Sequence, residues 1–469
     1  MECHEPASQP VDRGLPSADA SRPGLPRALL LVLLGVLAFH LTWIALEPSP
    51  SYFEDEPHYS QFAHEDALLG NTSPLPGHLR FDQRPELGSR LLSRFVPKSE
   101  LPSLTREHVR GDPHLERTVR WWNLALLLVL LVLQALQARA LGLGRRGILL
   151  SALLLGLFPW FAFYVHSLWS EILHATLVAA SFLAIFAYLR SGRILPLLGG
   201  GLALGVALLA KGTMNPFLPV LLGGLLFHGW RSSAERSAAT RAALTLLPAT
   251  LFALAVALVI GPQLVANARA GHGARLAGNR WKNIEMGVLL EPRELQTQAE
   301  RLERAKLHQL YMGVGADYEA REAAAEERLR EHLSTEGFGE VALEQLRKLG
   351  LLLFRAPSFF ERALHERWGA TAPLFLRLLR IPGRVLWFAL LGLGLAGAVR
   401  FARRNEGFFL LFLFVLYYGA AVLAIPYKVR FLMPLVPPLA LLAAAMLDRP
   451  RRVSEPTGDQ PPRIQSQQP

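Results

Sequence analysis

The sequence predicts an all-α polytopic membrane protein with about ten transmembrane helices and further interfacial helices outside the membrane. Hydrophobic residues make up 51% of the 469 residues, and they are gathered in blocks rather than spread periodically. Arginines cluster in the short segments between these blocks, as they do in the cytoplasmic loops of membrane proteins. Cys3 is the single cysteine, so neither an intrachain disulfide nor a cysteine-based metal site is expected.

Eight apolar blocks are long enough to cross about 30 Å of hydrocarbon at roughly 20 residues each. They cover residues 28–46, 120–138, 147–165, 170–189, 242–262, 383–400, 407–425 and 429–447. The stretch 194–230 is also apolar, but Lys211, Gly212 and Thr213 interrupt its centre. This pattern predicts two short helices that meet at a turn, which brings the total to about ten spans.

The basic clusters predict the orientation of the chain. If the N-terminus is cytoplasmic, every short basic loop falls on the same side, so both termini are expected in the cytoplasm. We expect a multi-pass protein of a bacterial inner membrane, in contact with membrane lipids. The clusters contain Arg139, Arg145 and Arg146; Arg190 and Arg193; Arg231, Arg236 and Arg241; Arg400, Arg403 and Arg404; and Arg449, Arg451 and Arg452.

The formal charge of +11 and the pI of about 10.1 are values that would also suit a nucleic-acid-binding protein. Because the arginines lie between apolar blocks, their distribution favours a topological role. We therefore expect no nucleic-acid partner.

The same topology divides the chain into five parts. Two tails are predicted to be disordered and cytoplasmic, and two long polar segments are predicted to be external. The second polar segment has helical spacing over 294–351 and suits an interfacial helix over 349–380. The parts are the tail 1–27, the N-terminal transmembrane module 28–266 with its external loop 47–118, the external loop and interfacial helices 267–382, the C-terminal transmembrane helices 383–447, and the tail 448–469.

An acidic turn follows the first span closely. It reads Asp55-Glu56-Pro57-His58-Tyr59, and the proline suits the first position of a helix that the preceding acidic residue caps. One interpretation is a solvated capping cluster. The other is a catalytic site, because a positioned carboxylate can take a proton from an attacking hydroxyl group.

Three further motifs accompany this turn. They are Gln83-Arg84-Pro85-Glu86-Leu87 in the same loop, Lys211-Gly212-Thr213 at the centre, and Tyr427-Lys428-Val429-Arg430 before the last span. In this order, over most of the chain, the motifs resemble the GT-C superfamily of glycosyltransferases. They are more specifically similar to the branch with protein O-mannosyltransferases and lipid A aminoarabinose transferases.

The resemblance implies an enzyme that takes a sugar from a polyprenyl-phosphate-linked donor and transfers it, with inversion, to a lipid, glycan or protein acceptor on the periplasmic side. It implies that Asp55 is the catalytic base. Under the same resemblance, Glu56 is expected to orient the acceptor or, with His58, to contribute to a divalent-metal site. The sequence identifies neither the sugar nor the acceptor, and metal dependence stays open.

Four basic residues are candidates for the donor phosphate, whose negative charge develops as it leaves. They are Arg84, Arg430, Lys428 and Lys211. The motif around Arg84 keeps the basic residue but lacks the second proline of the related motif, which weakens that assignment. Snorkelling of Arg430 and an ordinary interfacial position for Lys211 are the structural alternatives.

The segment His166-Ser167-Leu168-Trp169-Ser170-Glu171 is predicted to form a tight external turn. Capping of the next helix by Ser170 and Glu171 is the structural interpretation. The functional interpretation places Tyr59, His166 and Glu171 in the polar wall of a substrate cavity.

Two other classes of function remain open. One is a transporter or flippase of lipid-linked sugars, for which polar residues at mid-membrane and related halves would be expected. The other is a non-catalytic membrane scaffold, in which loss of Asp55 or Arg430 would leave function intact.

Overall fold

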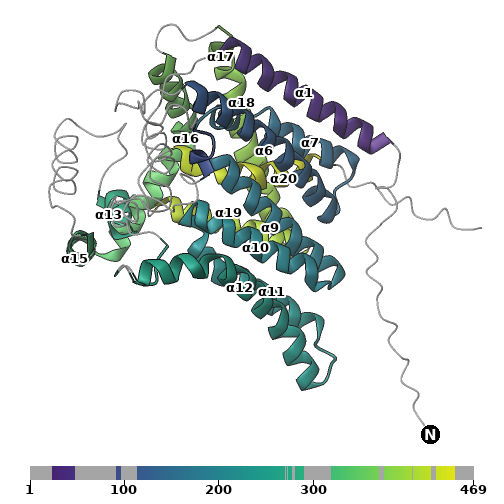
Figure 1. Cartoon of the computed structure of the whole chain (residues 1–469), viewed down its shortest axis with the longest axis vertical. Coiled ribbons are helices and arrows are strands. Elements are labelled where there is room, and N and C mark those ends of the chain that lie inside the picture. Colours follow the sequence, from purple (N-terminus) through teal and green to yellow (C-terminus); the bar gives the residue numbers. More distant parts are fainter. Residues whose placement is uncertain are drawn as a thin grey trace, which may run out of the picture.

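The computed structural model of the chain is built of helices throughout its described part (Figure 1). The predicted all-α class is thereby confirmed for these residues. The structure describes residues 24–47, 91–96, 113–168, 170–269, 271, 273–276, 280–289, 318–368, 374–403, 405–423 and 429–448.

Most of the described helices are joined by connections of a few residues. They are α1 (Gly24–Leu46), α6 (Pro113–Ala140), α7 (Arg145–Gly156), α8 (Pro159–Val165), α9 (Glu171–Ser191), α10 (Ile194–Ala210), η3 (Gly212–Phe217), α11 (Leu218–Ser232), α12 (Ala238–Arg269), α13 (Arg280–Leu289), α15 (Tyr318–Glu336), α16 (Phe338–Trp368), α17 (Leu374–Leu378), α18 (Arg380–Phe401), α19 (Glu406–Leu423), η5 (Val429–Leu435) and α20 (Val436–Leu447).

The predicted total of about ten spans is not confirmed. Among the described residues, five helices are long and apolar enough to cross a membrane, or six if the bent pair α7–α8 is one span. The five are α1, α6, α9, α12 and α18. Three shorter apolar helices, over 194–210, 406–422 and 431–447, match other predicted blocks but are shorter than the roughly 20 residues of a straight span.

The block 147–165, predicted as one span, is instead two helices bent by 59°. Pro159 occupies the start of α8, and Phe158 before it has extended backbone angles (φ −69°, ψ 112°). A proline disfavours helical angles in the residue that precedes it, so the helix ends there. The bend shortens the path of this segment through the bundle.

The prediction for 194–230 is confirmed, because α10 and α11 meet at a break. Lys211 is extended there (φ −158°, ψ 113°), and the short helix η3 follows it. The prediction for the external helices needs a correction. One helix, α16, runs through residues 349–351, where a boundary was expected, and the break falls earlier, at Gly337 with a φ of 81°.

Glycines allow close contacts between helices of the described part. A Cβ atom on Gly201 of α10 would lie 2.7 Å from the carbonyl oxygen of Phe252 in α12. A Cβ atom on Gly397 of α18 would lie 2.5 Å from the carbonyl oxygen of Leu442 in α20. Any side chain at these positions would push the helices apart.

The short basic loops share one end of the bundle, which we call the basic end. Asp448, after α20, accepts a 2.6 Å hydrogen bond from the backbone N–H of Gly144 before α7. His228 near the end of α11 contacts Glu406 at the start of α19, and the ring of Tyr188 packs on His228. These contacts hold the ends of five helices together.

The opposite end carries the end of α1, the turn between α8 and α9, the break at Lys211 and the start of η5; we call it the η5 end. Helix α16 packs there against η5 and α18. Figure 1 shows α13 and α15 beside the bundle, with α16 leading back to it. These three helices share a small core of Val288, Leu329 and Val341.

Candidate functional site

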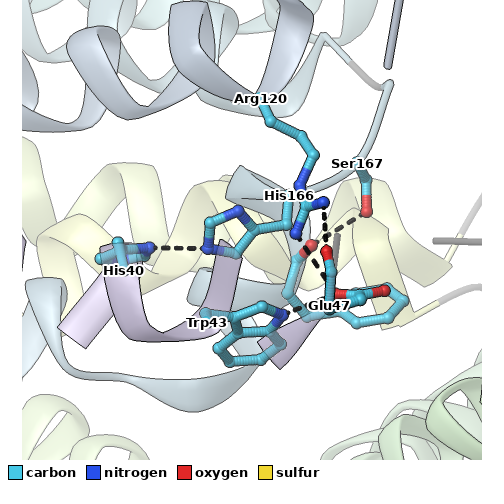
Figure 2. Close-up of polar contacts among 7 residues, drawn as sticks. His40, Trp43, Glu47, Arg120, His166 and Ser167 are labelled. Atoms are coloured by element: carbon cyan, nitrogen blue, oxygen red, sulfur yellow. Dashed lines mark hydrogen bonds and ion pairs between the residues drawn. The ribbon is translucent and has the colours of Figure 1, made fainter. Parts of the chain in front are cut away.

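Buried polar side chains gather at the η5 end, and they come from separate segments of the chain. Figure 2 shows one group, formed by α1, α6 and the turn after α8. A second group joins α9, the break after α10 and η5. Burial of polar groups without partners is costly, so their hydrogen bonds and ion pairs define the geometry of this end.

The first group centres on Glu47, the last described residue after α1. Its carboxylate oxygen Oε2 accepts a 2.8 Å hydrogen bond from Trp43 Nε1 and lies 3.4 Å from Arg120 Nη2. Arg120 Nη1 also donates to the Glu47 carbonyl oxygen at 2.6 Å. Both charged side chains are only 4% exposed. The pair fixes the end of α1 against α6 (Figure 2). In the sequence, the segment 47–118 that contains Asp55 begins at the same residue.

His166 lies at the centre of the same group. Its Nε2 is 3.0 Å from Nδ1 of His40, and its ring stacks on Trp43 at 5.2 Å between centroids and 27° between planes. The next residue, Ser167, accepts a 2.8 Å hydrogen bond on its carbonyl oxygen from Asn123 Nδ2. The segment 166–171, predicted as a tight turn, is therefore tied to both α1 and α6 through His166 and Ser167.

The second group centres on an ion pair between Glu171 and Lys211. Lys211 Nζ lies 3.0 Å from Glu171 Oε1, and the two side chains are 14% and 2% exposed. Lys211 Nζ also lies 5.1 Å from the centre of the Phe431 ring, a cation–π distance. Three segments thus meet at one ammonium group: the start of α9, the break after α10, and η5.

The capping interpretation of this turn is not supported by the geometry. Ser170 is the residue before α9, but its side chain makes no capping hydrogen bond. Glu171 lies in the first turn of α9, where a negative charge is favoured by the helix dipole, and it directs its carboxylate to Lys211. Because the helix is interrupted at Lys211, between α10 and η3, the ammonium group lies within reach of α9.

Of the predicted site residues, the structure brings Glu171 and Lys211 into contact and places His166 in the neighbouring group at the same end. The backbone of Arg430 lies in η5 next to Phe431, while its side chain lies outside the described part. The remaining predicted residues also lie outside it. They are Asp55, Glu56, His58, Tyr59, Arg84 and Lys428.

Four residues of this end were missed by the sequence analysis: His40, Trp43, Glu47 and Arg120. One signal was available, since ionisable residues inside or at the ends of apolar blocks are costly unless they have partners. His40 interrupts the first block, and Arg120 begins the second. The contacts of His40 with His166 and of Arg120 with Glu47 could not be predicted from the sequence, because they depend on how the helices pack.

Within the described ranges, no three His, Cys, Asp or Glu side chains gather as a metal site would require. The predicted candidates Glu56 and His58 lie outside these ranges.

No family model and no curated protein matches the chain. Among solved structures, it is similar to oligosaccharyltransferase AglB from Archaeoglobus fulgidus, in complex with an inhibitory peptide and a dolichol-phosphate. That match has 14% identity and a TM-score of 0.46, and it covers 90% of this chain and 50% of AglB. Another structure of the A. fulgidus oligosaccharyltransferase contains Zn and sulfate.

Two other solved structures are similar. The S. cerevisiae protein O-mannosyltransferase Pmt1–Pmt2 complex, bound to its sugar donor, matches at 17% identity and a TM-score of 0.41, covering 57% of this chain and 36% of that chain. ArnT from Cupriavidus metallidurans, bound to undecaprenyl phosphate, matches at 15% identity and a TM-score of 0.33, covering 92% and 79%.

These solved structures are GT-C glycosyltransferases, the superfamily that the sequence motifs resemble. The chain spans about half the length of the oligosaccharyltransferase that it matches. All three TM-scores are below 0.5 and all identities below 25%.

Proposed function

We propose that the chain is a membrane glycosyltransferase. It transfers a hexosyl or pentosyl group from a polyprenyl-phosphate-linked donor to a lipid, glycan or protein acceptor on the periplasmic side of a bacterial inner membrane. The observation that carries this proposal is the Glu171–Lys211 pair next to η5. It lies at the end of the bundle from which the loop 47–118, with its acidic motif, departs.

Lys211 is suited to bind the donor phosphate. A lysine ammonium group has three donors, so Lys211 can keep its bond to Glu171 and still donate to a phosphate oxygen. The Glu171 carboxylate also offsets the charge of this largely buried ammonium group. Arg430 belongs to η5, beside the Phe431 ring that Lys211 contacts, and in this proposal it supplies a second cation for the charge that develops on the leaving phosphate.

Asp55 is the base of the proposed reaction. It follows Glu47 by eight residues, so its Cα lies within about 28 Å of Glu47 even along a fully extended chain. The carboxylate takes the proton of the acceptor hydroxyl group while the hydroxyl oxygen forms a bond to the anomeric carbon. The bond from that carbon to the phosphate oxygen breaks, and the electron pair leaves with the lipid phosphate. Attack opposite the leaving group inverts the anomeric centre.

Glu56 and Tyr59 belong to the same proposed site, the first to orient the acceptor and the second to line the cavity. Carboxylate and imidazole groups are ligands of divalent cations, so Glu56 and His58 are the residues that would hold such an ion. Bound there, it would offset negative charge on the donor phosphate. Arg84 and Lys428 complete the proposed set of phosphate contacts.

Transfer of radiolabelled sugar by the purified protein tests this function. Wild-type protein is incubated in detergent with polyprenyl-phosphate sugars and candidate acceptors, and compared with Asp55→Asn and with the neighbouring control Glu54→Gln. We expect transfer by the wild type and the control, and loss of at least about a hundredfold in Asp55→Asn, the range typical of general-base catalysis. Equal transfer by Asp55→Asn and wild type contradicts the proposed base. Movement of intact lipid-linked sugar across proteoliposomes, with no transfer, supports a flippase instead.

A further inference from the structure

Two residues of α9 hold the break at Lys211. Glu171 lies 3.0 Å from the ammonium group of Lys211. His174 follows Glu171 by three residues, so the two side chains project from the same face of α9. The Nδ1 atom of His174 lies 3.2 Å from the carbonyl oxygen of Ala207, in the last turn of α10. The first contact holds the side chain of Lys211, and the second holds the end of the helix that carries it.

The carbonyl oxygen of Ala207 also bonds to Lys211 itself. It accepts a 2.8 Å hydrogen bond from the backbone N–H of Lys211, and the chain becomes extended at this residue. A carbonyl oxygen has two lone pairs, so it can accept one hydrogen bond from α10 and one from α9. His174 therefore ties the backbone at Lys211 to α9, the helix that also carries Glu171.

The direction of the bond from His174 follows from its partner. A carbonyl oxygen can only accept, so Nδ1 of His174 carries a proton and donates it. This N–H group is present in the neutral ring with its proton on Nδ1 and in the protonated ring, so the bond exists in both states. The ring is fully buried. It therefore acts on a substrate only through the backbone that it holds.

The stability of the bundle does not by itself favour an imidazole at this position. The second ring nitrogen, Nε2, is buried without a hydrogen-bond partner in the described part of the chain, and such an atom is costly. Without His174, the Ala207 carbonyl group would still bond to the N–H of Lys211. An apolar side chain would thus leave fewer polar atoms without partners. The gain from the imidazole is the position that it gives to Lys211.

We propose that His174 is a positioning residue, whose bond to Ala207 holds the break so that the Lys211 ammonium group can bind Glu171 and a polyprenyl phosphate together. This inference rests on the proposed function, because Lys211 binds the lipid phosphate only under that proposal. His174 itself touches neither the phosphate nor the sugar.

Chemical labelling of lysine tests the positioning without any substrate. The purified protein is methylated with formaldehyde and cyanoborohydride, and mass spectrometry follows the rate at each lysine. Lys211 is 14% exposed and paired, so it should react slowly in the wild type. We expect His174→Leu to raise its rate about threefold or more, as for loss of one hydrogen bond that holds it. His174→Asn keeps an amide N–H for Ala207 and should stay close to the wild type.

Two controls accompany this measurement. Ser181→Ala changes a residue about two turns farther along α9, whose buried hydroxyl group also has no hydrogen-bond partner among the described residues. It should leave the rate at Lys211 unchanged. Lys348 of α16 is 3% exposed and paired with Glu344, so its slow labelling in every variant is the internal reference.

Binding of a polyprenyl monophosphate tests the link to the substrate. Its affinity is compared with that of the polyprenol of equal length, which lacks the phosphate. We expect His174→Leu to weaken binding of the monophosphate about tenfold and binding of the polyprenol not at all, since charge-assisted bonds to phosphate are strong. In a Lys211→Gln background, His174→Leu should have no further effect, because a positioning residue acts through the lysine. The Tm of His174→Leu should equal or exceed that of the wild type.

The outcomes separate the two proposals. An unchanged rate at Lys211 in His174→Leu overturns the role of His174, as do additive effects of His174→Leu and Lys211→Gln on binding. A His174→Leu protein that fails to fold also overturns it, because the imidazole would then be required for stability. Equal binding of monophosphate and polyprenol by the wild type contradicts the proposed phosphate site, whereas the labelling rates still support or overturn the hold of His174 on Lys211.

Discussion

Replacement of Arg120 by methionine should destabilise the protein strongly. Both members of the Arg120–Glu47 pair are 4% exposed, so Arg120→Met leaves a carboxylate buried without the guanidinium that neutralises it. Removal of one partner from a buried ion pair costs about 3–5 kcal/mol. The entropy of unfolding, about 2.1 cal/mol/K per residue in globular proteins, amounts to about 1 kcal/mol/K for a chain of this length. The expected decrease in Tm is therefore about 3–5 °C.

The double variant Arg120→Met with Glu47→Leu separates loss of the pair from loss of contacts. When both charges of a buried pair are replaced by apolar groups, stability is often unchanged or increased. We therefore expect the double variant to recover most of the lost Tm. Arg330→Met is the control, since Arg330 is 77% exposed in its pair with Glu326, and an exposed pair of this kind contributes about 0.3–0.5 kcal/mol.

The assay is tryptophan fluorescence of the purified protein in detergent during heating, at one scan rate for all variants, because unfolding of membrane proteins can be irreversible. A Tm of Arg120→Met within 1 °C of the wild type would refute the reasoning. So would a double variant whose decrease in Tm equals the sum of the decreases in Arg120→Met alone and in Glu47→Leu alone.

Three further predictions follow from contacts at other positions. Gly397→Ala should lower the Tm, because its Cβ would lie 2.5 Å from a carbonyl oxygen of α20. The control Gly392→Ala, whose Cβ would have no atom within 4 Å, should leave the Tm unchanged. Equal effects of the two substitutions in the same thermal assay contradict glycine-mediated packing. Asp448→Ala removes the acceptor of the N–H of Gly144, and should cost about 1 kcal/mol of stability, as for other helix caps; an unchanged Tm argues against this contact. Lys211→Gln should raise the KM for the lipid-linked donor about tenfold or more, since charge-assisted bonds to phosphate are strong; an unchanged donor KM in sugar-transfer assays argues against a phosphate contact.

The fold was predictable to the extent that it depends on local pattern. Apolar blocks and the interruption at Lys211 predicted where helices begin and end, because hydropathy and turn residues act over a few positions. The bend at Pro159 was not predicted, because the block around this proline is continuously apolar, although a proline disfavours helical angles in the residue before it. The number of spans was not confirmed, because several apolar helices of the described part are shorter than a straight crossing requires.

The candidate site was predictable only for residues that stand out in the sequence. Lys211, His166 and Glu171 were identified because they are polar residues next to apolar blocks. Their partners depend on the packing of helices distant in sequence, and no local pattern predicts that His40 meets His166 across 126 positions. The acidic motif at Asp55 stays a prediction, since it lies outside the described residues.

A doubly labelled donor tests the proposed glycosyltransferase most directly. Polyprenyl-phosphate sugar carrying tritium in the sugar and 32P in the phosphate is supplied to wild-type protein and to Asp55→Asn in proteoliposomes with an acceptor. A glycosyltransferase releases free 32P-labelled lipid phosphate in amounts equal to the tritiated, anomerically inverted product, and Asp55→Asn releases at least about a hundredfold less of both. Labels that stay together on one lipid while it crosses the bilayer contradict this account and identify a flippase.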